Sequence, residues 1–340
     1  MEVLVTGANG FVGHHLAAAL SARGDTVRAL VLPSEDATWL GEHGVIAYRG
    51  DIRDPDTLAE PMRGVDIVFH LAAVHGLWRP RHEYHTINVL GVENVCRAAA
   101  IAGVRRLVHV SSWTVYGMGF SDPVGEDHPL QPIPDPYTLT KVEGERRLRA
   151  FIARDHLPAV IVRPGTMFGP GDRVNFGRMV ERLRRGRVAV IGAGSNALPF
   201  VYVSDVVRGM ILAAEAEGAQ GQTYNLSNDE PLTQEEMWRV IAAEIGVRPR
   251  LFHVPYRPLY ALGFIAEHAA SLSRSQRQPL VTRLGLQLFG TNNRHAIDKA
   301  RSELGYRPQV SIREGIRLAA RWHQQVAESA MHANRLPARA

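Results

Sequence analysis

Short apolar runs and longer amphipathic stretches alternate along the first half of the chain. Apolar runs that predict strands lie at residues 2–7 (EVLVTG), 26–32, 45–51, 65–73, 105–112 and 157–165. Helical spacing of apolar residues separates several of them, at residues 11–24, at 83–103 and from Tyr137 onward. Strands joined through helices form parallel sheets, and nearly continuous apolar character is typical of strands covered on both faces. The pattern therefore predicts an α/β fold, a doubly wound parallel sheet of the Rossmann type.

The alternation is less regular after about residue 165. Helical patterns occur at residues 175–186, 204–216 and 233–246, and short strand-like runs at 188–192, 199–203 and 223–227. We predict a dinucleotide-binding Rossmann domain over residues 1–165. A smaller, mixed substrate-binding portion over residues 166–327 is expected to be partly interleaved with the Rossmann sheet. Residues 328–340 have no periodicity and are expected to form a mobile tail.

Composition narrows the class of protein. The 340 residues are 45% hydrophobic and 21% charged, and the formal net charge of +5 comes mainly from scattered arginines. Scattered charge predicts a solvated surface and no nucleic-acid partner. A single cysteine, Cys96, excludes an internal disulfide and suits a reducing compartment. The N-terminus lacks a signal-peptide pattern, and no apolar run approaches the ~20 residues of a membrane span, so we expect a cytoplasmic protein.

Fifteen histidines raise the question of a metal site. The densest group is His75, His82 and His85, but no cysteine or acidic residue stands at a metal-ligand spacing from them. We expect these histidines in loops and on helix surfaces, and we predict no metal.

A glycine pattern, TGANGFVG, stands between the first strand and the first helix and contains Gly7, Gly10 and Gly13. Such a loop turns tightly and lets backbone N–H groups approach a pyrophosphate at the positive end of the helix. A side chain at Gly7 or Gly10 would obstruct that approach. Because the strand and the helix are both in place, the pattern predicts a dinucleotide cofactor, NAD(P).

The end of the second strand bears on which form of the cofactor binds. An acidic residue there would bind a free ribose hydroxyl, and an arginine would bind a 2′-phosphate. The sequence places Val31, Leu32, Pro33 and Ser34 at this tip, and no cation. We therefore expect NAD to bind at least as well as NADP, with Ser34, Glu35 or Asp36 able to reach the ribose.

Tyr137 and Lys141 stand four residues apart at the start of a predicted helix, in DPYTLTKVEGE. Residues at this spacing share a helix face, and an ammonium near a tyrosine favours the phenolate. A lowered pKa would let Tyr137 act as acid and base near neutral pH. The fifth strand ends in VSSWTVYG, at the edge of the sheet where ligands bind in such folds. A serine there is placed to hydrogen-bond the same carbonyl that Tyr137 would protonate.

Taken together, these motifs resemble the extended short-chain dehydrogenase/reductase family over residues 1 to about 325. The stretches that carry the resemblance are TGANGFVG, GDIRD, HLAA, NVLGVEN, VSSWTVYG, YTLTK, RPGTMFGPGD and PFVYVSDV. The resemblance implies a catalytic set in which Ser112 orients the substrate and Tyr137 is the acid/base. It also implies that Lys141 lowers the pKa of Tyr137 and holds the nicotinamide ribose.

The resemblance further implies where the cofactor lies. Asp51 and Ile52 would contact adenine, Ala72 and Ala73 would line the cofactor path, and residues 164–166 would lie beside the nicotinamide. The full predicted set of cofactor-binding residues is Gly7, Asn9, Gly10, Phe11, Val12, Gly13, Leu32, Ser34, Asp51, Ile52, Leu71, Ala72, Ala73, Val110, Tyr137, Lys141, Pro164, Gly165 and Thr166.

One position separates two branches of the family. Nucleotide-sugar epimerases and dehydratases usually carry a QTRDF-like segment whose arginine holds the diphosphate, and here Leu198 stands in its place. IGAGSNALPFVYV is more similar to the 3β-hydroxysteroid dehydrogenase and dihydroflavonol reductase-like branch. We predict an NAD(P)-dependent oxidoreductase that interconverts a secondary alcohol and a ketone on an apolar, sterol-like or acyl substrate. A nucleotide-sugar epimerase or dehydratase is the alternative, and a catalytically silent dinucleotide sensor is a third hypothesis.

Two apolar stretches of the C-terminal half, at residues 251–272 and 281–290, leave three interpretations open. They are compatible with the wall of a substrate cavity, with peripheral contact at a membrane surface, and with ordinary core helices. We also expect the chain to form a homodimer.

Overall fold

The computed structural model describes residues 1–75, 79–272, 279 and 281–333. A seven-stranded parallel sheet forms the centre of the larger lobe, in the order β10-β6-β5-β4-β1-β2-β3. This order confirms the predicted doubly wound sheet. The strands are β1 (Glu2–Thr6), β2 (Thr26–Val31), β3 (Ile46–Arg49), β4 (Ile67–His70), β5 (Arg106–Val110), β6 (Ala159–Pro164) and β10 (Thr223–Leu226).

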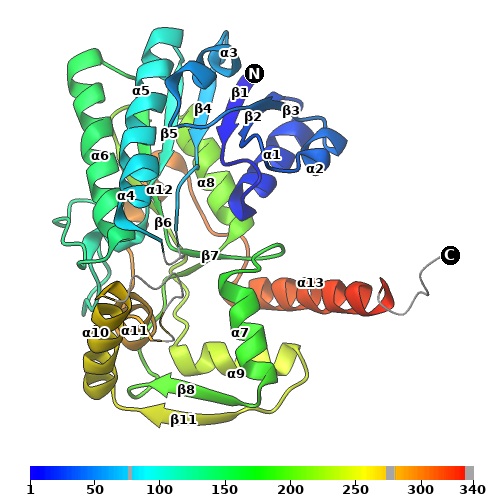
Figure 1. Cartoon of the computed structure of the whole chain (residues 1–340), viewed down its shortest axis with the longest axis vertical. Helices are drawn as coiled ribbons and strands as arrows, with labels where there is room; N and C mark the ends of the chain where they lie inside the picture. The colour runs from blue at the N-terminus through cyan, green and yellow to red at the C-terminus, as the bar shows by residue number, and fades with distance from the viewer. Residues whose placement is uncertain (76–78, 273–278, 280, 334–340) are drawn as a thin grey trace.

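Helices cover both faces of this sheet (Figure 1). On one face lie α1 (Phe11–Ala22) and α8 (Val203–Glu215), and on the other α5 (Gly91–Ala102) and α6 (Pro136–Asp155). Successive strand residues point to opposite faces, and both faces are buried, which explains why the strands are apolar almost throughout. The shorter helical elements of this lobe are α2 (Thr38–Glu42), α3 (Ala59–Met62), α4 (Arg81–His85), α12 (Asp298–Leu304), the π-helix η2 (Thr86–Leu90) and the 3₁₀ turns η1 (Pro55–Leu58), η3 (Trp113–Tyr116) and η4 (Glu217–Ala219).

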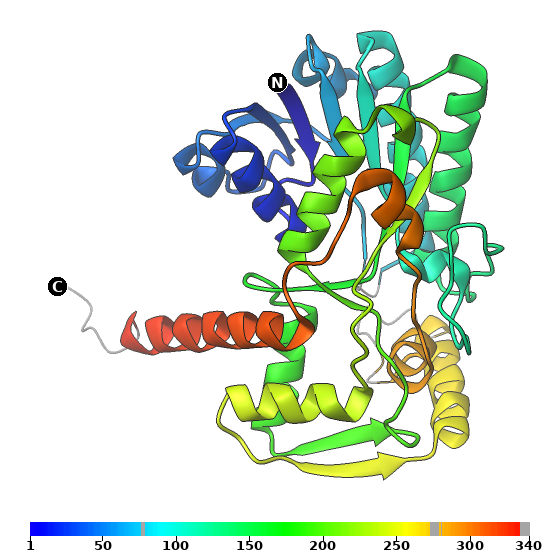
Figure 2. The same ribbon diagram turned by 180° about the vertical axis from the view of Figure 1, so that it is seen from behind.

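A smaller lobe is built around a second hydrophobic core that contains Phe176, Phe200 and Trp238. The strands β7 and β9 form a small parallel pair of their own, and α9 opens with the capping box of Thr233 and Glu236. Figure 2 shows the two lobes from behind. The elements are β7 (Thr166–Phe168), β9 (Phe200–Tyr202), β8 (Arg187–Ile191), β11 (Arg250–Val254), α7 (Asn175–Arg184), α9 (Gln234–Glu244), α10 (Tyr256–Leu272), α11 (Arg283–Gly290) and α13 (Ile312–Ala333).

The end of the chain differs from the prediction. Residues 328–333, expected to belong to a mobile tail, continue α13 to Ala333. Alanine, glutamate and methionine have high intrinsic helix propensity, so a helix can continue here without an apolar period. Residues 334–340 lie outside the described part of the chain.

The described residues contain neither a helix that could cross a membrane nor a cluster of metal-binding side chains. None of their helices is long and apolar enough to cross a membrane. Their His, Cys, Asp and Glu side chains form no group of three or more that could hold a metal ion.

Candidate active site

The predicted site residues gather at the carboxyl edge of the main sheet, where α/β folds bind ligands. The glycine loop follows β1, and Leu32 and Ser34 follow β2. Asp51 and Ile52 follow β3, and residues 71–73 follow β4. Val110 ends β5, with Ser112 two residues on, and residues 164–166 join β6 to β7. Tyr137 and Lys141 lie in the first turns of α6, which packs on the same part of the sheet.

The glycine loop has the close backbone contacts that its pattern predicts. Gly7 has a φ of +73°, and a Cβ there would lie 2.8 Å from the backbone nitrogen of Ala72. A Cβ at Gly13 would lie 2.1 Å from the Gly7 carbonyl oxygen. Only glycine fits at either position, and the loop begins the helix α1 whose N–H groups face the sheet edge. This cradle fits the pyrophosphate of a dinucleotide.

The tip of β2 differs from the prediction in one respect. The sequence places no cation there, but Arg49, at the end of the neighbouring strand β3, donates hydrogen bonds to the carbonyl oxygens of Leu32 (3.2 Å) and Glu35. The pairing of Val31 with Arg49 in the parallel ladder brings the guanidinium to this place. The Glu35 carboxylate accepts from the Leu32 N–H (3.1 Å) and from Asn9 (3.4 Å). An acidic side chain therefore lies between the β2 tip and the glycine loop, where a ribose hydroxyl would be bound.

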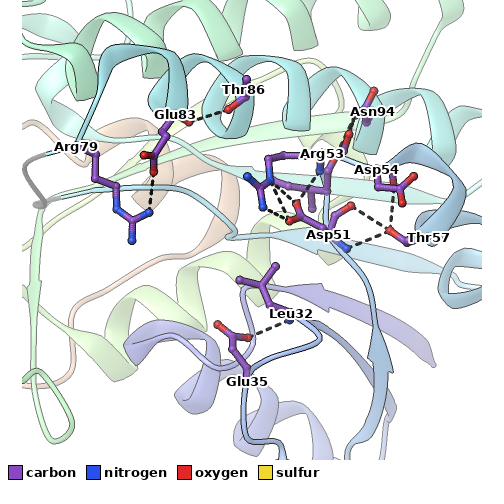
Figure 3. A network of polar contacts seen from close by, with 11 residues as sticks. Leu32, Glu35, Asp51, Arg53, Asp54, Thr57, Arg79, Glu83, Thr86 and Asn94 are labelled. Atoms are coloured by element: carbon purple, nitrogen blue, oxygen red, sulfur yellow. Dashed lines mark hydrogen bonds and ion pairs between the residues drawn. The ribbon is translucent and has the colours of Figure 1, made fainter.

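Asp51 lies close to this tip, as Figure 3 shows. Both of its carboxylate oxygens accept from Nε of Arg53, at 3.0 and 2.9 Å. Burial acts to raise the pKa of Asp51, but the hydrogen bonds from Arg53 outweigh it and the pKa is lowered. The next residue, Ile52, is buried against Gly91, so its side chain faces the core and only its backbone is free to face a ligand.

Tyr137 is held at the N-terminal end of α6. Asp135 caps this helix by accepting from the N–H groups of Tyr137 (2.9 Å) and Thr138 (3.3 Å), and Pro136 occupies the first turn. The Ser112 hydroxyl, which is hydrogen-bonded to the Thr114 hydroxyl at 2.9 Å, lies close enough to Tyr137 to act on the pKa of its phenol. The structure thus brings together the hydroxyls of two residues 25 positions apart in the sequence.

The pKa of Tyr137 is not lowered in the protein by itself. Burial raises it, and the nearby Ser112 side chain only partly opposes this effect. Lys141 is not among the groups that act on this pKa, and its ammonium donates to the carbonyl oxygen of Val110, at 2.6 Å. Burial lowers the pKa of Lys141 to about 8, and the carboxylate of Glu145 acts to raise it.

The Glu145 carboxylate belongs to a buried polar network that sequence reasoning missed. Arg163 of β6 donates to both of its oxygens, from Nε at 2.9 Å and from Nη2 at 2.6 Å, and both side chains are almost fully buried. Arg163 also donates to the Tyr116 hydroxyl (2.8 Å), which in turn donates to Asn225 (2.7 Å). The only sequence signals were a glutamate four residues after Lys141 and an arginine inside an apolar strand.

Asn88 is a second residue that sequence reasoning did not single out. It lies buried in η2, and its side-chain amide exchanges two hydrogen bonds with the backbone of Val74, at 2.8 and 3.0 Å. The same amide donates to the Thr140 hydroxyl on α6 (3.1 Å). Asn88 therefore ties the loop after β4 to the helix that carries Tyr137. A π-turn of this kind often marks a functional site, but a helical period in the sequence does not show it.

A row of polar side chains crosses the sheet on the α6 side. Thr6, His70 and His109 stand side by side on β1, β4 and β5. The Thr6 hydroxyl bonds Nδ1 of His70 at 2.7 Å, and the two imidazole rings lie 5.4 Å apart. Burial lowers the pKa of His70 to about 3 and that of His109 well below its usual value, with the nearby Lys141 charge acting in the same direction. Both rings are therefore neutral.

Comparison with known proteins places the chain among dinucleotide-dependent enzymes. The model of the NAD dependent epimerase/dehydratase family matches residues 3–227. A 2-alkyl-3-oxoalkanoate reductase of Stenotrophomonas maltophilia (strain K279a) is 35% identical over 332 residues, covering 93% of this chain and 98% of that protein. A 4-hydroxy-2-methyl-3-oxo-4-farnesyl-3,4-dihydroquinoline-1-oxide ketoreductase of Stigmatella aurantiaca is 32% identical, covering 93% and 95%.

One solved structure has a similar fold over nearly the whole chain. The dTDP-glucose 4,6-dehydratase DesIV of Streptomyces venezuelae, solved with NAD bound, superposes with a TM-score of 0.79 and 27% identity. The match covers 97% of this chain and 98% of that one.

Proposed function

Because the chain belongs to the NAD dependent epimerase/dehydratase family, we propose that it is an oxidoreductase that interconverts a secondary alcohol and a ketone on an apolar substrate. The observation that carries the proposal is the proximity of the Ser112 and Tyr137 side chains at the carboxyl end of β5, with Lys141 one helical turn after Tyr137. Two relatives that match nearly the whole chain are named as reductases of ketones that bear alkyl or farnesyl groups.

Each residue of the site has a separate part in the proposed reaction. Bound NAD(H) supplies or accepts the hydride at the carbinol carbon. Ser112 holds the substrate oxygen by a hydrogen bond, and Tyr137 gives the proton to that oxygen during reduction or takes it during oxidation. Lys141, whose ammonium is held by the Val110 carbonyl, keeps a positive charge close to the reacting groups.

The cofactor contacts follow from the geometry of the sheet edge. The glycine loop would hold the pyrophosphate, Asp51 would accept from the adenine amino group, and Glu35 would accept from the ribose. Because Glu35 is an acid at the ribose position, NAD is the proposed cofactor. The Arg49 guanidinium lies beside Glu35, so a site for the 2′-phosphate of NADP is also compatible with this tip. Fluorescence titration with both reduced cofactors distinguishes NAD from NADP.

Leu198 supports a carbonyl substrate over a sugar nucleotide. Its side chain is buried in the core of the smaller lobe, where the corresponding arginine of sugar-nucleotide enzymes would meet two phosphate charges. Burial of those charges without a cation is costly. The alternative is a nucleotide-sugar epimerase or dehydratase, in which the same oxidation is transient.

The test is a turnover measurement with both reduced cofactors and three substrates: a long-chain 3-keto compound, a steroid ketone and a UDP-linked sugar. The proposed function predicts net loss of reduced-cofactor absorbance with an apolar ketone, and none with the Tyr137→Phe variant. An epimerase would give almost no net change. A dose-dependent thermal shift with the UDP-linked sugar, and none with either ketone, would restore the alternative.

We also propose a cytoplasmic location and a homodimer. A single buried cysteine, Cys96, is compatible with a reducing compartment. Light scattering on the purified protein gives the number of subunits, and a monomeric mass would contradict the dimer.

A further inference from the structure

Exposed apolar side chains are concentrated in one segment of the smaller lobe. Among the described residues, thirteen large apolar side chains are exposed, and five of these lie within 21 consecutive positions. They are Phe252 on β11 and Leu262, Phe264, Ile265 and Leu272 on α10, with exposed fractions from 37% to 87%. Single exposed apolar residues are ordinary, but a cluster of this kind marks a surface that contacts another body.

The outer face of α10 is apolar along the whole helix. Its exposed positions three and four apart are Pro258, Ala261, Leu262, Ile265, Ala269 and Leu272. We call this set the α10 face. Glu267 lies on the other side of the helix, where its carboxylate accepts from the backbone N–H and the guanidinium of Arg283 on α11, at 2.7 and 2.6 Å, whereas Arg257 and His268 are exposed. A surface helix of a globular protein normally has the opposite arrangement.

Positive charge lies at the start of α10 and beside Phe252 on β11. Arg248, Arg250 and Arg257 are exposed, and none of them has an acidic partner among the described residues. Arg250 pairs with Arg187 across the ladder of β11 and β8, and the Arg187 guanidinium lies over the Phe252 ring at 5.5 Å. Cations around an exposed apolar helix face complement anionic lipid headgroups.

The Glu267–Arg283 pair lies near enough to the start of α6, the helix of the candidate active site, for its charges to act there. The charges of Glu267 and Arg283 act on the pKa of Asp135, the N-cap of α6, in opposite directions. Asp135 stands two residues before Tyr137 and binds its backbone N–H. The helix α10 therefore presents an apolar surface outward, and the charge of its Glu267 acts on the N-cap of α6; Figure 1 shows α10 in the smaller lobe, below α4 and α6.

We propose that the α10 face, together with Phe252, docks on the surface of an anionic lipid bilayer. The helix lies in the plane of the headgroups with its apolar side buried roughly 5–10 Å. A second copy of the chain is the other candidate occupant, but a single helix face is narrow compared with the roughly 20–30 residues per side of a stable protein interface. Only one part of this proposal rests on the proposed function: an apolar substrate dissolved in the bilayer would enter the site beside α6.

The experiment is co-sedimentation of the full chain with lipid vesicles. One set contains phosphatidylcholine alone, and the other contains equal parts of phosphatidylcholine and phosphatidylglycerol. The double variant L262D/I265D removes the apolar face. The matched control I101D/V326D adds the same two charges at exposed aliphatic residues on α5 and α13. Thermal midpoints of all three proteins confirm folding.

The wild type and the control are expected to sediment with the anionic vesicles, and L262D/I265D to bind them at least about tenfold more weakly. High salt should weaken binding by the wild type. Failure of the wild type to bind, or equal binding by both double variants, overturns the proposal. If the wild type does not bind vesicles, and if light scattering shows that L262D/I265D is a monomer where the wild type is a dimer, the α10 face is a subunit contact.

Turnover of a water-soluble ketone should be equal in all three proteins. Absence of turnover in every one would contradict the proposed function without affecting the vesicle result.

Discussion

Glu145→Gln is the substitution that most directly tests the polar network beneath the site. It removes one charge of a buried pair and leaves the buried Arg163 guanidinium without its carboxylate partner. Loss of one partner from a buried pair typically costs about 3–5 kcal/mol. Arg163 keeps its bonds to Tyr116 and to the Glu126 carbonyl, so we expect a value near the lower limit. This is a large part of the roughly 5–15 kcal/mol that stabilises a typical domain.

Urea unfolding measures this loss directly. Glu143→Gln is the control, because Glu143 is on the same helix but exposed, with Arg147 at 3.4 Å, and should cost less than about 0.5 kcal/mol. The double variant E145Q/R163M removes both charges and should recover most of the loss. A midpoint for Glu145→Gln equal to that of Glu143→Gln would refute the reasoning.

The same variant has a second readout in the pH dependence of turnover. Burial lowers the pKa of Lys141 to about 8, and Glu145 acts to raise it. Without the carboxylate the ammonium is lost at a lower pH. If Lys141 must be charged, the alkaline fall in turnover should therefore begin at a lower pH in Glu145→Gln than in the wild type. An unchanged alkaline limb would show that Glu145 does not act through Lys141.

Three further variants test the site. Tyr137→Phe keeps the ring but removes the proton donor, so turnover should fall by about 10² to 10⁴ while cofactor titration stays normal; near-normal turnover would remove Tyr137 from the mechanism. Gly13→Ala puts a Cβ 2.1 Å from the Gly7 carbonyl oxygen, so it should cost about 1–3 kcal/mol and weaken cofactor binding, whereas Gly41→Ala meets nothing within 4 Å and should do neither. Glu35→Ala removes the acid at the β2 tip and leaves Arg49, so the ratio of NADP to NAD affinity should rise; an unchanged ratio in fluorescence titrations would exclude Glu35 from the ribose site.

Local signals explain what the sequence could predict. The strands, the glycine loop and the helix that contains Tyr137 and Lys141 are each determined by residues close together in the sequence. The structure contains all three of these elements. Arg49 was missed at the β2 tip because its place depends on the register between two strands. The partner of Lys141 was missed for a similar reason, since the Val110 carbonyl is 31 residues away.

The neutral histidine row has a consequence for the range of pH in which the fold persists. An unfolded chain takes up protons on histidine near pH 6.5. In the folded chain, burial lowers the pKa of His70 to about 3 and that of His109 well below its usual value. Below pH 6.5 the unfolded state therefore binds more protons, and each of these rings removes about 1.4 kcal/mol of stability per unit of falling pH. The side chains that keep the carboxyl edge of the sheet polar but uncharged also make the protein labile to acid.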